Sequence, residues 1–107
     1  DQMALTAADT VGGYAWAKAG FDFENKLSAE GVATRTEKTL RTLARNDQLP
    51  AGVAEQGAEL VRRARSDDPN ERPTPMEFAM LGWTPGATTW PGKQTMLGGH
   101  WDGVKDL

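Results

Sequence analysis

The chain has 107 residues, with 12 basic and 15 acidic side chains, a formal net charge of -3 and no cysteine. This length predicts one domain with a small core, since such a domain buries only about two thirds of its unfolded surface. The charge balance excludes a global attraction to nucleic acid, the lack of cysteine excludes disulfide and thiolate chemistry, and no apolar run in the sequence reaches the ~20 residues of a membrane span.

The apolar content is low for a globular chain. Ile is absent, and Val, Leu and Phe together number 17, below the ~20% that these residues usually reach. Four Trp, one Tyr and four Met add apolar surface, and the net charge is too small to hold the chain open. We therefore expect most of the chain to fold, alone or with a partner that covers one face. Its start at Asp1 predicts a processed product, an excised domain or the visible part of a longer protein. The sequence leaves the localisation open between a soluble cytoplasmic protein and one exported as part of a larger protein.

Residues 3–23 have the pattern strand, helix, strand. Residues 3–8 alternate weakly between apolar and polar side chains, and the Asp-Thr pair after them can cap a helix by accepting a backbone N–H. Gly20 can take the left-handed conformation that ends a helix. Residues 21–23 then read apolar, polar, apolar, as a strand does.

Residues 28–82 form a helical region. A first amphipathic helix is predicted from Ser28 to about Asn46, and residues 46–48 end it. Pro50 fits the first turn of the next helix, where its missing N–H costs nothing. The apolar stripe of that second helix is Val53, Gly57, Leu60, Val61 and Ala64.

Two features of the second helix predict contacts. Gly57 lies on the apolar stripe and marks a close helix crossing, although it lowers helix propensity by about 1 kcal/mol relative to Ala. The basic cluster of the chain shares this helix with two glutamates, so we expect a solvated face that pairs with itself. The residues of this face are Arg62, Arg63, Arg65, Glu55 and Glu59.

A polar loop follows over residues 66–73. It ends on Thr74, Pro75 and Glu77, which together predict a capping box and a helix that stops at Gly82. The oxygen-rich side chains of the loop lack the glycine-containing geometry of a calcium loop, and we interpret them as solvated turn residues. They are Asp67, Asp68, Asn70 and Glu71.

Residues 83–107 are rich in Trp, Gly and Pro. We expect turns at residues 85–86 and 91–92, little other regular structure, and a short terminal strand over residues 101–107. Trp83, Trp90 and Trp101 have few aliphatic neighbours in the sequence. Either they form a surface that docks on a partner, or they fold back over the helices and complete the core.

The segment from Asp9 to Phe21 resembles the late strand-helix-strand motif of the GNAT acyltransferase superfamily. That motif has an Asn and, seven residues later, a Tyr in a phrase such as Phe-Tyr-Glu-Lys-Leu-Gly-Phe. Lys18 and Gly20 are identical to it, as is Phe21, and the spacing agrees without a gap. Together with the closing phrase Leu-Gly-Gly-x-Trp-x-Gly-Val, the segment is also similar to the tail of degenerate domains in large actinobacterial and phage-associated toxin or capsid-associated proteins.

The chain departs from the GNAT pattern at the positions that carry chemistry. The resemblance implies a helix Tyr that protonates the coenzyme A thiolate, but Trp16 stands at that position and an indole N–H cannot perform this step. It also implies a Gly-rich pyrophosphate-binding loop before the motif, and only eight residues precede Asp9. We therefore expect no cofactor-binding residues in this chain. Acetyl-coenzyme A, and any acyltransferase activity, would require an N-terminal half outside it.

The candidate catalytic residues are Tyr14 and His100. Tyr14 lies two residues before the motif's Tyr position and should point elsewhere on the helix. His100 is the single histidine, and with Asp102 it does not make a triad, because both serines of the chain lie at predicted helix boundaries. No His, Cys or carboxylate cluster has the spacing of a metal site.

The sequence thus predicts a helix-rich α+β domain, single or the C-terminal part of a larger one, with a sheet edge from residues 3–8, 21–23 and 101–107. The leading hypothesis is a GNAT-like C-terminal half, catalytically incomplete alone, from a larger toxin-like or phage-associated protein. The alternative is a structural or interaction module that docks through Trp83, Trp90 and Trp101. Both hypotheses name a protein partner or the parent polypeptide, and neither involves nucleic acid or a membrane.

Overall fold

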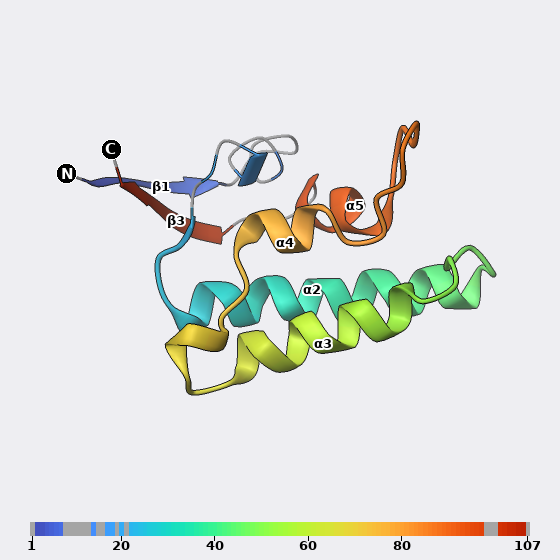
Figure 1. The fold of residues 1–107 in the computed structure, drawn as a ribbon, viewed down its shortest axis with the longest axis horizontal. Helices are drawn as coiled ribbons and strands as arrows, with labels where there is room; N and C mark the ends of the chain where they lie inside the picture. Colours follow the sequence, from blue (N-terminus) through green and yellow to red (C-terminus); the bar gives the residue numbers. More distant parts are fainter. Residues whose placement is uncertain are drawn as a thin grey trace.

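The computed structural model describes residues 2–7, 14, 17–18, 20, 22–97 and 101–106, and it shows a helix-rich chain with one small sheet (Figure 1). Tyr14, Ala17 and Lys18 are helical. The elements follow in the order β1 (Gln2–Ala7), β2 (Asp22–Phe23), α2 (Lys26–Arg45), α3 (Val53–Arg65), the 3-10 helix η1 (Pro69–Glu71), α4 (Pro75–Ala79), α5 (Pro91–Leu97) and β3 (Trp101–Asp106).

The sheet joins the two ends of the chain. Its strand order is β1-β3-β2, and β3 runs antiparallel to both neighbours. Gln2 lies opposite Asp106 in one pairing, and Phe23 lies opposite Gly103 in the other. The three strands predicted from the sequence are confirmed, within a residue or two at each end. Strand β3 lies between β1 and β2, so β1 and β2 are not hydrogen-bonded to each other.

Helix α2 begins two residues earlier than predicted, because Asn25 caps it. The Asn25 side chain accepts a hydrogen bond from the Ser28 N–H at 3.0 Å and so satisfies one of the free donors of the first turn. The helix ends at Arg45, and Asp47 then takes a positive φ of 58°. The predicted break after this helix is confirmed.

Helix α3 buries all five residues of the apolar stripe that the sequence predicted. They are Val53, Gly57, Leu60, Val61 and Ala64. The prediction that Pro50 lies in its first turn is wrong. Gly52 is the N-cap with a φ of 83°, which no right-handed helical residue adopts, so the helix starts at Val53. Gly57 confirms the predicted close crossing, because a Cβ there would collide with the Leu40 side chain of α2.

Helix α4 has the predicted capping box. The Thr74 hydroxyl accepts from the Glu77 N–H at 3.2 Å, and the Glu77 carboxylate accepts from the Thr74 N–H at 2.8 Å. The helix stops at Ala79, three residues before the predicted end. The Leu81 N–H donates to the Phe78 carbonyl, which tightens the last turn, and the chain reverses at Gly82 with a φ of 77°.

Helix α5 replaces the turn that the sequence predicted at residues 91–92, and this prediction is wrong. Pro91 occupies the first helical turn, and Gly92 lies directly against α4. A Cβ at Gly92 would collide with the carbonyl oxygens of Phe78 and Ala79, and its N–H donates to the Leu81 carbonyl at 2.9 Å. Gly92 lowers the helix propensity of this segment, but the close packing of α5 against α4 requires a residue without a side chain at this position. The turn predicted at residues 85–86 is confirmed.

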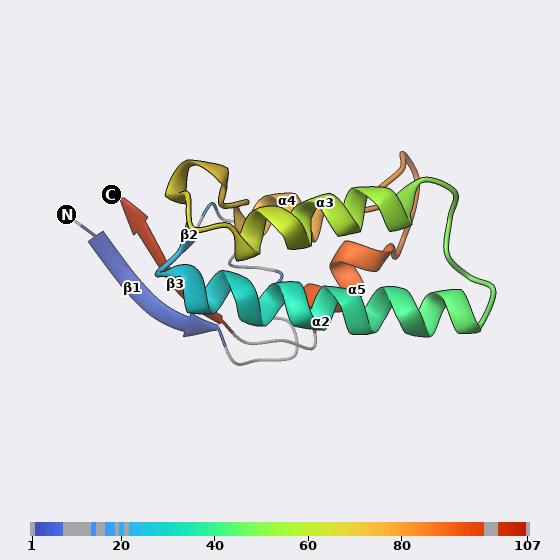
Figure 2. The same ribbon diagram turned by 90° about the horizontal axis from the view of Figure 1, so that it is seen from below.

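The core lies between α2 and the elements around it, since α2 contacts α3, α4, α5, β2 and β3 (Figures 1 and 2). Phe78 and Met96 are its largest fully buried apolar side chains, and the Phe78 ring meets Phe23 edge-on at 5.9 Å. Among the described residues no helix is long and apolar enough to cross a membrane.

Candidate interaction surface

Tyr14, one of the two candidate catalytic residues, lies in an aromatic cluster. Its half-buried ring meets the Trp90 ring edge-on at 6.0 Å, and the Lys93 ammonium lies 5.5 Å from the Tyr14 ring and 5.2 Å from the Trp90 ring. These contacts are packing and cation–π contacts, and none of them supplies a base for proton transfer. His100, the other candidate, lies outside the described residues, as does Trp16.

The three tryptophans of the tail differ in position. Trp90 is 9% exposed and its indole N–H donates to the Ala79 carbonyl at 2.6 Å, so this ring completes the core instead of offering a docking surface. Trp83 is 45% exposed. Trp101 is the first residue of β3, and its side chain lies outside the described part of the chain. Docking through the tail stays a prediction for Trp83 and Trp101.

A hollow of about 530 Å³ lies beside Trp83. It is bounded by the connection between α2 and α3, the start of α3, and the segment that leads into α5. Its lining includes Gln48, Pro50, Val53, Trp83, Trp90 and Gln94. The exposed Trp83 ring therefore stands at the edge of a concave surface.

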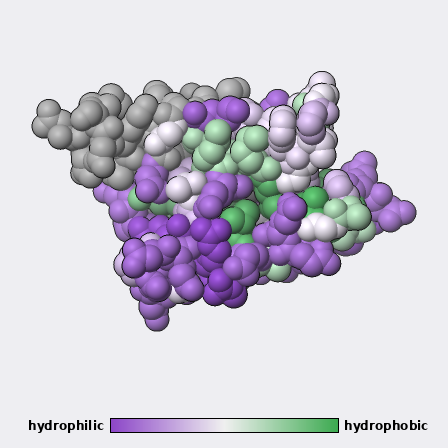
Figure 3. Space-filling model, viewed as in Figure 1, coloured by the Kyte–Doolittle hydropathy of each residue, from purple (hydrophilic) through white to green (hydrophobic). Residues whose placement is uncertain are grey.

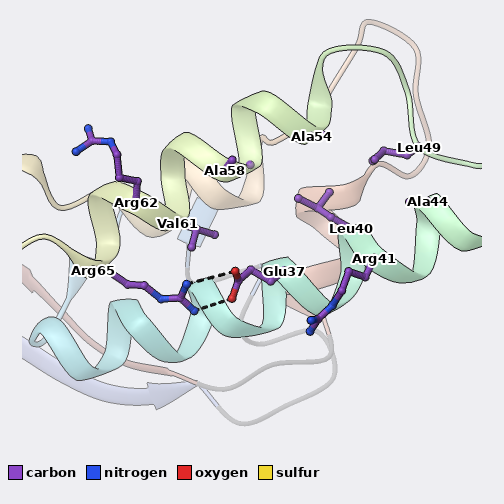
Figure 4. Close-up of a pocket in the computed structure, with 11 residues that line it drawn as sticks. Glu37, Leu40, Arg41, Ala44, Leu49, Ala54, Ala58, Val61, Arg62 and Arg65 are labelled. Atoms are coloured by element: carbon purple, nitrogen blue, oxygen red, sulfur yellow. Dashed lines mark hydrogen bonds and ion pairs between the residues drawn. The ribbon is translucent and has the colours of Figure 1, made fainter.

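A second hollow of about 530 Å³ is an apolar groove between α2 and α3, which we call the α2–α3 groove (Figure 4). In the close-up, Leu40 and Leu49 point into the space between the two helices, and Val61 faces them from α3. Leu40 and Leu49 are packed against the core but only partly buried. The apolar lining of the groove comes from Leu40, Ala44, Leu49, Ala54, Ala58 and Val61.

Three arginines also line the groove, but in the close-up only Arg65 crosses between the two helices, while Arg41 and Arg62 point away from the space between them (Figure 4). Arg65 spans from α3 to Glu37 of α2 at 2.6 Å and closes one end (Figure 4). This hydrogen-bonded pairing lowers the pKa of the Glu37 carboxyl. Arg41 forms no ion pair or hydrogen bond within the part of the chain that the structure describes, although its charge also helps to lower the pKa of Glu37.

The expected self-pairing of the basic cluster is confirmed only for Arg62, which holds Glu59 at 2.8 Å on its own helix. Arg63 instead reaches the Glu77 carboxylate of α4 at 3.3 Å. Arg65 reaches Glu37 on α2. The sequence could not show the last two pairs, because their partners are 14 and 28 residues away.

The acidic residues of the loop after α3 have structural partners. Asp67 pairs with Lys26 at 2.5 Å, Glu71 lies 3.7 Å from Arg62, and the Asp68 side chain caps η1 by accepting from the Asn70 N–H. In residues 22–97 and the other described positions, no three His, Asp or Glu side chains gather as a set of metal ligands.

A third apolar area lies on the face shown in Figure 3, where hydrophobic side chains are visible at the centre among hydrophilic ones. It corresponds to a shallow hollow between α3 and α4, lined by Leu60, Met80 and Leu81 with glutamates at its edge.

Comparison of the chain with protein-family models, curated proteins and solved structures found no match.

Proposed function

We propose that this chain is a protein-interaction module that binds an acidic amphipathic helix of a partner protein in the α2–α3 groove. The observation that carries the proposal is the apolar floor between two packed helices, edged by three arginines and one glutamate. An amphipathic helix recognises such a groove through apolar anchors spaced three or four residues apart.

The groove has the dimensions that this mode requires. Its α2 side extends from Glu37 to Ala44, about 10 Å along the helix at 1.5 Å per residue. That length matches about two turns of a partner helix, which would present anchors at positions i, i+3 or i+4, and i+7. Leu40, Leu49 and Val61 would receive these anchors.

The local charge favours an acidic partner, although the chain as a whole carries a net charge of -3. Of the three arginines that line the groove, Arg62 already pairs with Glu59 and Glu71 and Arg65 pairs with Glu37, which leaves Arg41 to attract a partner carboxylate. Arg41 is exposed and has no ion pair among the described residues, so a partner carboxylate could pair with it without breaking an existing contact.

Two synthetic amphipathic peptides test this proposal. They share one apolar face of leucines, and one carries Glu and the other Lys on its polar face. In ¹⁵N-detected NMR titrations we expect the Glu peptide to shift the amides of Leu40, Ala44 and Ala58, against the repulsion of the chain's net charge. If neither peptide binds, or if the Lys peptide binds equally well, the proposal is wrong.

A second proposal keeps the resemblance to the GNAT superfamily. In it the chain is the catalytically incomplete C-terminal half of a GNAT-like domain in a larger toxin-like or phage-associated protein. It is supported by the order β1, helical residues, Gly20 with a φ of 90°, and β2, which follows the strand-helix-strand motif. Docking through Trp83 onto a neighbouring part of that protein is compatible with both proposals.

Titration calorimetry with acetyl-coenzyme A tests the second proposal. The eight residues ahead of Asp9 contain no glycine and thus no Gly-rich loop, so we expect no appreciable heat of binding by the 107 residues alone. Micromolar binding that involves residues 3–23 would show that they do not belong to the late half of such a fold.

A further inference from the structure

A polar hollow of about 280 Å³ lies where α2 and α5 meet. Four of its residues fall at positions i, i+3, i+4 and i+7 of α2 and share one face of that helix. With 3.6 residues per turn, this face lies on the other side of α2 from the groove residues Glu37 and Ala44. The lining is Arg35, Lys38, Thr39, Thr42, Leu43 and Gln94, which contains two cations and no carboxylate.

Arg35 supplies the observation that points to a ligand. Its side chain is half-buried, and its Nε is fully enclosed with no hydrogen-bond acceptor. A guanidinium stays charged in proteins, and an enclosed donor without an acceptor costs free energy. Lys38 also has no ion pair, and the hydroxyls of Thr39 and Thr42 make no hydrogen bond, within the ranges that the structure describes. The hollow therefore collects donors and positive charge for which these residues supply no acceptor.

We propose that this hollow binds an oxyanion of the phosphate class, either inorganic phosphate or the phosphate group of a small molecule. The two terminal nitrogens of the Arg35 guanidinium, unlike its enclosed Nε, can each donate a hydrogen bond to one such anion, and Lys38 can add a point charge. The Thr42 hydroxyl and the Gln94 amide can donate from other directions. A tetrahedral anion accepts along all of these directions, whereas a carboxylate accepts mainly in its own plane.

The size of the hollow agrees with a small ligand. Its volume of about 280 Å³ is several times the ~30 Å³ that one water takes in the liquid, and it lies just below the ~300–1,000 Å³ of drug-sized sites. A phosphate ion or a short phosphate ester fits these limits. The proposal is independent of the α2–α3 groove, because no hollow residue lines both.

The test is a titration of the full chain with sodium phosphate, followed by ¹⁵N NMR of the Arg35 Nε–H and the α2 amides. Sodium chloride at matched ionic strength is the control. We expect a saturable shift of the Arg35 Nε–H that chloride does not reproduce, and a melting temperature that rises with phosphate. No saturable shift beyond the chloride control would overturn the proposal.

Variants locate the site. Arg35→Gln is expected to raise the Kd for phosphate about tenfold or more, since it removes charge-assisted hydrogen bonds. Arg45→Gln makes the same change of charge on the same helix outside the hollow, and it should leave the Kd unchanged. If both variants weaken binding equally, the attraction is non-specific and the proposal is wrong. Thr42→Val removes one hydrogen-bond donor while keeping a similar side-chain volume, and it should raise the Kd for phosphate several-fold. This variant tests the site if Arg35→Gln does not fold.

Two further probes define the ligand class. Acetate should bind more weakly than phosphate, and equal affinity would contradict the assignment to the phosphate class. Glycerol phosphate separates the two sources of the anion. Tighter binding than inorganic phosphate identifies a phosphate ester as the ligand, and weaker binding identifies the free ion; both results support the site.

Discussion

Trp90 connects the start of α5 to α4 through one hydrogen bond and a large buried ring. Its indole N–H reaches the Ala79 carbonyl at 2.6 Å, and Tyr14 packs against its edge. Lys93, one turn further along the chain, lies over the faces of both rings. This cluster joins the helical residues near the start of the chain to a helix near its end.

Replacing Trp90 should therefore destabilise the fold. Trp90→Phe leaves the Ala79 carbonyl without its donor, and we expect a loss of about 1–3 kcal/mol in the free energy of unfolding. Trp83→Phe is the matched control, because Trp83 is 45% exposed and makes no hydrogen bond through its ring within the described residues. Urea denaturation of the two variants measures the difference.

In acrylamide quenching, Trp90 should account for a shielded part of the fluorescence and Trp83 for an accessible part; the reverse would contradict the burial of Trp90.

The Thr74 side chain stabilises α4 through its hydroxyl, which caps the start of the helix. Thr74→Ala removes the acceptor for the Glu77 N–H and should lower the free energy of unfolding by about 1 kcal/mol. Thr84→Ala, in an exposed loop, is the control and should have little effect. Thermal melts compare the two, and an unchanged melting temperature for Thr74→Ala would mean that the capping box does not stabilise α4.

At the scale of helices, two glycines of the α2–α3 pair should respond differently to the same substitution. A Cβ at Gly31, exposed on α2, meets nothing within 4 Å, so Gly31→Ala should stabilise the chain by about 0.5–1 kcal/mol. Gly57→Ala gains the same propensity but must displace the Leu40 side chain at the crossing. We expect it to be less stable than Gly31→Ala in urea denaturation. Equal stabilisation would show that the helices do not cross as closely as described.

The Glu37–Arg65 pair also acts between α2 and α3, and its contribution depends on pH. The pKa of Glu37 is lowered from its ordinary value of 4.5, chiefly by the hydrogen bond from Arg65. The stabilisation is complete above the unfolded pKa and is lost as the pH falls through the lower pKa of the folded state. Because Arg65 is 45% exposed and Glu37 41% exposed, solvent and salt screen the pair and its contribution to stability should be small.

Melting temperatures of Glu37→Gln across a pH series check this expectation. The variant should melt below the wild-type chain at pH 7, and the two should converge as the pH falls below about 4.5. A difference for Glu37→Gln that persists at the lowest pH would mean that the pair stabilises the fold by packing and not by charge.

The elements that the sequence could predict depend on local signals. The capping box at Thr74, the stripe of α3 and the break after α2 each follow from residues within one or two turns of each other. Helix α5 could not be predicted, because Gly92 is required by its close approach to α4, a contact that exists only in the folded chain. The α2–α3 groove was missed because Leu40 fits the periodicity of a core residue, and only the folded structure shows that it is incompletely covered.

At the scale of the whole molecule, α2 is the element on which the others pack. The sheet contacts α2 near one end, α3 runs beside α2, and the short helix α5 contacts only part of it (Figure 2). This arrangement leaves two concave surfaces on different sides of one helix, an apolar groove toward α3 and a polar hollow toward α5. A module with this architecture could bind a helical partner and an anion at the same time.

The affinity of the chain for the acidic amphipathic peptide, measured with one variant that blocks the groove and one control variant, shows whether the peptide binds in the α2–α3 groove. Ala58→Glu places a carboxylate in the groove at an exposed position of α3, and it should weaken binding at least about tenfold because the new charge meets apolar and acidic side chains of the peptide. Leu27→Glu makes the same change of charge on α2 at a residue that is 75% exposed and outside the groove, and it should leave the affinity unchanged. Equal affinities for Ala58→Glu and the wild-type chain would contradict the assignment of the groove as the binding site.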